Sequence, residues 1–264
     1  MDLHVTQALR AGRAAAPAPP APGQHALVAG GAGALGAAVL ERLLGRGGFG
    51  RVRVLVEQPL AAHLRGLEPL RWQGAATALP DGPLTTAVLV LDRGRHANGR
   101  EAAFWRPRPE DLPAFAGVLH AAGVRRLLVV TPQATALPQA LRHGLASLDE
   151  QAVAALGFER LVFMRPAQAG AAERAARAPE RLAQWLLSQL RVMVPQREQP
   201  VRAAKVAAFA AELAHGLANA PPGTRVVPAE QVWEAAQAPD TAAAARAWLA
   251  GSAIGHATVA LPRM

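Results

Sequence analysis

Several residue types that carry chemistry in proteins are absent or rare in this chain of 264 residues. It contains no cysteine, which excludes disulfides, thiolate metal sites and a cysteine nucleophile. It also contains no tyrosine, so no phenol can donate a proton, and Lys205 is its only lysine. Aromatic residues make up 4% and hydrophobic residues 51%, so we expect a core of alanine, valine and leucine.

Long hydrophobic runs are absent as well. No stretch approaches the length of a membrane span, and no hydrophobic core of a signal peptide lies near Met1. We therefore expect a cytoplasmic protein without a membrane partner. Residues 1–24 are rich in proline and alanine, which predicts a disordered leader.

The chain has a formal net charge of +9, nearly all of it from arginine, and such a charge invites a nucleic-acid partner. The arginines are scattered, for example in pairs at 51/53 and 125/126, without a dense run or interleaved aromatic residues. We therefore do not expect nucleic-acid binding.

The most informative stretch is 25–44, HALVAGGAGALGAAVLERLL. An apolar run at 26–29 predicts a strand, a glycine-rich turn follows, and leucines and valine at helical spacing predict a helix. This order is typical of a dinucleotide-binding βαβ unit, in which glycines admit the pyrophosphate and the helix N-terminus attracts its charge. The pattern can be read as G-x-G-x-x-G, with Gly31, Gly33 and Gly36, or as G-x-x-G-x-x-G, with Gly30, Gly33 and Gly36.

A second predicted strand, 51–56, ends at Glu57. In dinucleotide folds, an acidic residue about 20 residues beyond the glycines binds the ribose hydroxyls and favours NAD over NADP. The alternative, an ordinary solvated glutamate at a strand end, stays open.

Alternating strands and helices continue along the chain and predict one doubly wound, parallel α/β sheet of the Rossmann type over 25–236. We expect a small C-terminal helical cap or substrate portion from about residue 167, over the crevice, and a C-terminal extension over 237–264. The expected strands are 70–72, 87–91, 125–130, 161–164 and 225–227. The expected helices are 59–67, 109–122, 138–156, 179–190, one from about 203, and 230–236. The helix over 138–156 is expected to bury Leu141, Leu145, Leu148, Ala152 and Leu156.

Loops that follow strands line the ligand crevice in such folds. The fourth predicted strand runs into Leu91 and Asp92, and a polar loop with Arg93, Arg95 and His96 follows it. These residues are candidates for the crevice, with a solvated loop as the alternative.

The chain resembles the atypical, extended-like short-chain dehydrogenases/reductases, and within them the Tat-interacting-protein-like group of small NAD(P)-binding proteins. The resemblance covers about 25–236 and is carried by VAGGAGALG, VLVLDRGRHANGREAAF, HAAGVRRLLVVT, ALGFERLVFMRPAQ and PVRAAKVAAFAAEL. Sugar-nucleotide epimerases and isoflavone-reductase-like proteins are the neighbouring alternatives. The resemblance implies that Gly30, Gly33 and Gly36, with Ala34 and Leu35 at the helix start, hold the pyrophosphate. It also implies that Leu91 and Asp92 lie close to the cofactor, where a carboxylate weakens phosphate binding.

Active members of this family use a serine after the fifth strand and a Tyr-x-x-x-Lys motif on the next helix. The resemblance puts Thr131 or Pro132 at the serine, Arg142 at the tyrosine and Ala146 at the lysine. Tyrosine-dependent carbonyl reduction is therefore excluded. Thr131 and His143 are the weak candidates for a substitute acid, and no metal site is expected.

The sequence thus favours an NAD(P)-binding Rossmann protein that acts as a pseudoenzyme, either a cofactor-responsive regulator or a scaffold. The alternative is an NAD(P)-dependent oxidoreductase with an unconventional proton donor. A protein partner and a homodimer are left open.

Overall fold

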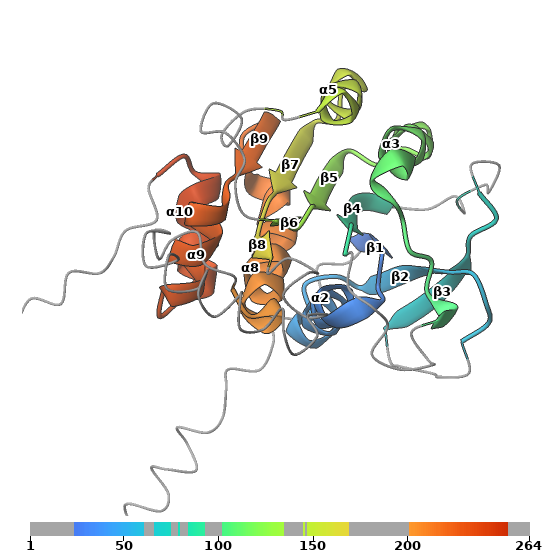
Figure 1. Cartoon of the computed structure of the whole chain (residues 1–264), viewed down its shortest axis with the longest axis horizontal. Coiled ribbons are helices and arrows are strands. Elements are labelled where there is room, and N and C mark those ends of the chain that lie inside the picture. Colours follow the sequence, from blue (N-terminus) through green and yellow to red (C-terminus); the bar gives the residue numbers. More distant parts are fainter. Residues whose placement is uncertain are drawn as a thin grey trace, which may run out of the picture.

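The computed structural model describes residues 24–60, 66–74, 79, 84–92, 102–134, 145, 147–168 and 201–252. Within these residues, the strands and helices follow one another in the order that Figure 1 shows. The helix predicted over 59–67 lies mostly outside the described residues, and its last residue, Leu67, begins a strand that continues to Arg71. Three predicted segments lie outside the described residues: residues 1–23 of the predicted leader, the helix predicted over 179–190, and residues 253–264 of the predicted C-terminal extension.

The central sheet has seven parallel strands in the order β3-β2-β1-β4-β5-β7-β9. Their bounds are β1 His25–Ala29, β2 Arg51–Val56, β3 Leu67–Arg71, β4 Leu84–Val90, β5 Arg126–Val130, β7 Arg160–Met164 and β9 Gly223–Val227. The strand order reverses between β1 and β4, because the chain builds outward from β1 first on one side and then on the other. Open sheets of this type bind ligands at the carboxyl ends of the strands beside such a reversal.

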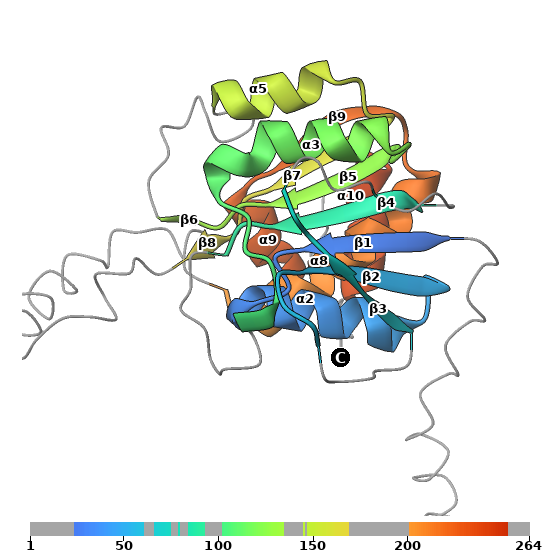
Figure 2. The ribbon, with the colours of Figure 1, turned by 90° about the vertical axis from the view of Figure 1, so that its right-hand side faces the viewer.

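Helices cover both faces of the sheet (Figures 1 and 2). One face carries α2 (Gly33–Arg46), α8 (Ala203–Gly216), α9 (Ala229–Gln237) and α10 (Thr241–Leu249); the other carries α3 (Leu112–Ala121) and α5 (Leu148–Ala155). The short 3-10 helices η2 (Pro109–Asp111) and η5 (Leu217–Asn219) precede α3 and follow α8, and β6 (Gln133–Ala134) pairs in parallel with β8 (Ala167–Gln168). The predicted Rossmann-type α/β fold is confirmed.

Burial along the strands explains why their sequences read as continuous apolar runs. In β1, Ala26 and Val28 pack into the layer with α2 and α8, while Leu27 and Ala29 pack into the layer with α3. A strand with helices on both faces needs apolar residues at every position. The edge strand β3 is only half-buried and tolerates Pro69, which a central strand would not.

The helix predicted over 138–156 is interrupted at Ser147, and residues 138–144 lie outside the described residues. Of its predicted buried residues, Leu145 and Leu156 pack against the core, whereas Leu148 and Ala152 are exposed. Ser147 has extended backbone angles, φ −136° and ψ 162°, and its hydroxyl accepts a hydrogen bond from the Glu150 N–H at 3.2 Å. It is therefore the N-cap of α5, which begins at Leu148. Leu148 is 81% exposed, and the buried side chains of α5 are Glu150 and Val153.

Residues 169–200 of the predicted C-terminal cap lie outside the described residues, so the cap stays a prediction. From Ala203 onward, the described residues form α8, α9 and α10, which join α2 in the layer over one face of the sheet (Figure 2). The apolar stripe of α8, with Val206, Phe209 and Leu213, packs there because it matches the sheet's apolar face. Helix α10 lies within the predicted C-terminal extension, and its Trp248 belongs to the same core. No helix among the described residues is long and apolar enough to cross a membrane.

Candidate functional site

The glycine turn lies between β1 and α2, at the carboxyl edge of the sheet beside the reversal of strand order. Gly30 and Gly33 have φ of 82° and 78°, in the left-handed region that favours glycine. A Cβ on Gly30 would lie 2.0 Å from the Val90 carbonyl oxygen, and one on Gly36 would lie 2.0 Å from the Gly30 carbonyl oxygen. Neighbouring backbone therefore excludes side chains at Gly30 and Gly36.

A carboxylate of the chain itself lies at the N-terminus of α2. The Leu35 N–H donates a hydrogen bond to Oδ2 of Asp92 at 3.1 Å, and a Cβ on Gly33 would lie 2.7 Å from the same oxygen. Ala32, the N-cap residue, offers no side-chain acceptor. Asp92 lies 57 residues beyond Leu35 in the sequence, yet it provides the negative charge that a helix N-terminus favours.

The segment 102–108 runs along the same edge and contacts the turn. Phe104 Cδ1 lies 3.2 Å from where a Cβ on Gly31 would be, and Pro107 Cδ lies 3.4 Å from the equivalent position on Gly30. Phe104 also forms an isolated antiparallel bridge with Val56, the last residue of β2. The chain thus covers its own glycine turn on the side of β2.

Two polar contacts fix this segment in place. The Ala103 carbonyl accepts a hydrogen bond from the Glu57 N–H at 2.8 Å, and Arg106 Nη2 donates to the Asp92 carbonyl at 3.3 Å. Arg106 thereby brings a guanidinium to the residue whose carboxylate contacts α2. Phe104 and Arg106 are not predictable as site residues from the sequence, because the polar loop around them shows no motif for an antiparallel bridge to β2.

The remaining predicted residues of the site lie along the same edge. Glu57 is exposed directly after β2, and Ala34 is exposed in the first turn of α2. Leu91 is buried after β4, where its N–H donates to the Val130 carbonyl at 2.9 Å. Thr131 is half-buried after β5, and its N–H donates to the Met164 carbonyl at 2.9 Å. The structure therefore brings the glycine turn, Asp92 and Glu57 to one edge.

Other predicted residues cannot be placed. His143, Arg142 and Ala146 lie outside the described residues, as do Arg93, Arg95 and His96. The role of His143 as a substitute acid and the place of the other residues in the crevice or at the family's catalytic positions therefore stay predictions.

A buried ion pair near this edge was not foreseen from the sequence. Arg165 follows β7 and is 2% exposed, and its Nη2 lies 2.5 Å from Oε2 of Glu150 on α5, which is 5% exposed. The sequence does contain a signal for the helix start, because Ser147 and Glu150 match the capping-box spacing S-x-x-E. The Glu150 side chain reaches Arg165, a contact that no local pattern specifies.

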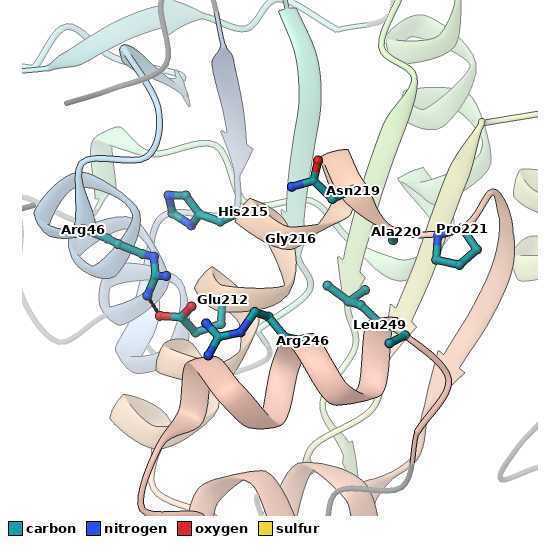
Figure 3. Close-up of a pocket in the computed structure, with 10 residues that line it drawn as sticks. Arg46, Glu212, His215, Gly216, Asn219, Ala220, Pro221, Arg246 and Leu249 are labelled. Atoms are coloured by element: carbon teal, nitrogen blue, oxygen red, sulfur yellow. Dashed lines mark ion pairs between the residues drawn. The ribbon is translucent and has the colours of Figure 1, made fainter. Parts of the chain in front are cut away.

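A hollow of about 300 Å³ lies at the opposite end of α2 from the glycine turn (Figure 3). Arg46 forms an ion pair with Glu212 in it, and Arg246 extends toward them from α10. Burial and the charge of Arg246 lower the pKa of Arg46. The described residues contain no group of three or more His, Cys, Asp or Glu side chains that could hold a metal.

No family model and no curated protein match the chain. Among solved structures, it is similar to the aureusimine biosynthetic cluster reductase domain, with 13% identity over 82% of this chain and 72% of that one, at a TM-score of 0.41. It is also similar to a UDP-N-acetylglucosamine 4-epimerase from Bacillus cereus, with 11% identity over 81% and 80% of the chains, at a TM-score of 0.37. A third is the Bordetella bronchiseptica enzyme WbmG in complex with NAD, with 15% identity over 87% and 95%, at a TM-score of 0.35. The resemblance to the Tat-interacting-protein-like group stays a prediction, and function has to be inferred from the chain's own residues.

Proposed function

We propose that this chain binds NAD(P) by its pyrophosphate at the glycine turn and acts without catalysis, as a cofactor-responsive regulator or scaffold. One observation carries the proposal: the Leu35 N–H at the start of α2 binds an anionic oxygen beside the reversal of strand order. Helix N-termini in this position bind phosphate through their free N–H groups and the helix dipole.

The groups at the glycine turn are chemically suited to bind a phosphate. The Asp92 carboxylate stands in for a phosphate oxygen, since both are anionic acceptors for the same N–H. The left-handed Gly33 has no side chain between the helix start and that oxygen. A pyrophosphate oxygen takes this place only when the Asp92 carboxylate leaves it.

Composition supports the non-catalytic part of the proposal. A bound nicotinamide supplies hydride transfer, but carbonyl reduction also needs a proton donor, and the chain has no tyrosine. Its only lysine, Lys205, is exposed in the first turn of α8. The chain therefore cannot form a Tyr-x-x-x-Lys pair.

Glu57 supports a preference for NAD. It is exposed directly after β2, so its carboxylate is accessible to the ribose hydroxyls of a dinucleotide on this edge. The same carboxylate repels the 2′-phosphate of NADP.

Calorimetric titration with NAD⁺, NADH, NADP⁺ and NADPH tests the proposal. We expect saturable binding, tighter for NAD(H), that is lost in Ala34→Asp, because that exposed first-turn position would carry a carboxylate into the phosphate site. Ala243→Asp is the matched control, because Ala243 is exposed in the first turn of α10. Absence of binding at millimolar dinucleotide in both the wild-type chain and Asp92→Ala would refute the proposal.

A second assay separates the regulator from the oxidoreductase. With binding established, we expect no oxidation of NADH or NADPH across a panel of carbonyl compounds. Substrate-dependent oxidation would replace the regulator with an enzyme that uses an unconventional donor.

A further inference from the structure

We propose that Asp92 is an internal competitor of the dinucleotide, so that the chain keeps its own phosphate site closed until a ligand displaces this carboxylate. This inference rests on the proposed function, and it assigns Asp92 the control of that site. Binding strength is then set by the difference between two anions that use one helix N-terminus.

The competition follows from the geometry of one donor. The Leu35 N–H points at Oδ2 of Asp92 at 3.1 Å, and the position of a Gly33 Cβ lies 2.7 Å from the same oxygen. A phosphate oxygen at hydrogen-bond distance from Leu35 would therefore overlap the carboxylate. Two anionic oxygens also repel each other at such a separation, so the two states exclude one another.

The closed state is held by more than one contact. Arg106 donates to the Asp92 carbonyl, and Phe104 and Pro107 of the same segment lie against Gly31 and Gly30. Displacement of Asp92 therefore works against contacts that keep its backbone and the segment 102–108 at the turn.

Asp92 also stabilises the ligand-free chain. The N-cap residue Ala32 makes no side-chain hydrogen bond, so Asp92 supplies the acceptor that α2 otherwise lacks. Its removal must then have opposite effects on two measurements. The ligand-free chain loses thermal stability, whereas the affinity for dinucleotide rises. A residue with a purely structural role would lower both.

The test compares the wild-type chain with Asp92→Ala and Asp92→Asn, by calorimetric titration with NADH and by thermal unfolding without ligand. We expect Asp92→Ala to bind NADH roughly tenfold more tightly, or about 1.4 kcal/mol, and to have a lower Tm when ligand-free. Asp92→Asn keeps an oxygen that can accept from Leu35 but loses the charge. It should fold normally and bind with intermediate affinity.

Asp149→Asn is the matched control, because it changes the net charge equally from an exposed site on α5, on the other face of the sheet. Its affinity should equal that of the wild-type chain. Equal binding by all four chains would overturn the inference and leave the proposed function standing. An equal gain in Asp149→Asn would also overturn it, since net charge alone would then explain the effect. Absence of binding in the wild-type chain and both Asp92 variants would overturn both proposals.

Discussion

Replacing Glu150 by alanine removes the carboxylate that faces the buried Arg165 guanidinium. The two side chains are 6% and 2% exposed, and Nη2 lies 2.5 Å from Oε2. At an effective dielectric constant of about 20, the attraction at this distance is roughly 6–7 kcal/mol before the cost of removing both charges from water. Because the remaining charge stays buried, we expect a net loss of about 3–5 kcal/mol in the free energy of unfolding.

This loss should be plain in the melting temperature. For a chain of this size, each kcal/mol shifts Tm by roughly 2–4 °C, so Glu150→Ala should melt roughly 6–20 °C lower. Differential scanning calorimetry and equilibrium unfolding in urea measure the two quantities. The double variant Arg165→Met/Glu150→Leu should recover most of the loss, because it leaves no buried charge.

An exposed ion pair supplies the control. Arg108 and Glu110 are 76% and 67% exposed and lie 3.8 Å apart, so Glu110→Ala should cost only about 0–1 kcal/mol. If Glu150→Ala were as mild as Glu110→Ala, or if the double variant were no better than Glu150→Ala, the buried pair would not have the energetic role described.

Two further predictions concern packing and pH. Gly36→Ala should lower the free energy of unfolding, measured in urea, by roughly 1–3 kcal/mol or more, because its Cβ would lie 2.0 Å from the Gly30 carbonyl oxygen. Gly45 lies on the same helix, but a Cβ there would have no neighbouring atom within 4 Å, so Gly45→Ala should raise the free energy of unfolding by about 0.5–1 kcal/mol. A Gly36→Ala variant as stable as the wild-type chain would contradict this turn geometry. Burial lowers the pKa of His215 from its ordinary 6.5. As the pH falls, the histidine is therefore protonated in the unfolded chain before it is protonated in the folded chain, and the free energy of unfolding should decrease below about pH 6.5. His215→Gln should flatten this dependence in unfolding measured from pH 7 to 5, and an unchanged slope would exclude His215 as its cause.

Burial is the main cause of the lowered pKa of His215, and the nearby positive charge of Arg46 adds to it. The Ala211 carbonyl, to which Nδ1 hydrogen-bonds at 2.6 Å, acts on the pKa in the opposite direction, and the His215 ring lies 4.5 Å from that of Phe49. Its Nε2 is buried without a hydrogen-bond partner among the described residues. A proton on Nε2 would therefore place a charge where neither water nor a described acceptor compensates it.

The amino-acid sequence alone determined most strands of the central sheet and their order along the chain. Continuous apolar runs such as 26–29 and 87–91 specified strands covered on both faces, and the spacing of Val206, Phe209 and Leu213 specified the buried face of α8. The glycine turn was also predictable, because it depends on residues within a few positions of one another. Local periodicity and local backbone freedom are properties that a short stretch carries by itself.

Some local signals were present but gave the wrong element. The apolar residues of 138–156 suggested one long helix, although Ser147 and Glu150 carry the capping signature of a later start. The buried face of α5 then differs from the apolar pattern because Glu150 is buried by its contact with Arg165. A charged side chain becomes a core residue only when its partner comes from elsewhere in the chain.

The family resemblance already implies that Asp92 lies near the cofactor site, but only the tertiary structure decided that its carboxylate accepts a hydrogen bond from the Leu35 N–H there. The parallel pairing of β1 with β4 brings Asp92 to the start of α2, and the bridge between Val56 and Phe104 brings Arg106 to Asp92. These contacts join residues far apart in sequence, and their identity depends on strand order and register. A glycine pattern specifies a turn that can accept an anion, but the fold determines that in the ligand-free chain this anion is the chain's own carboxylate.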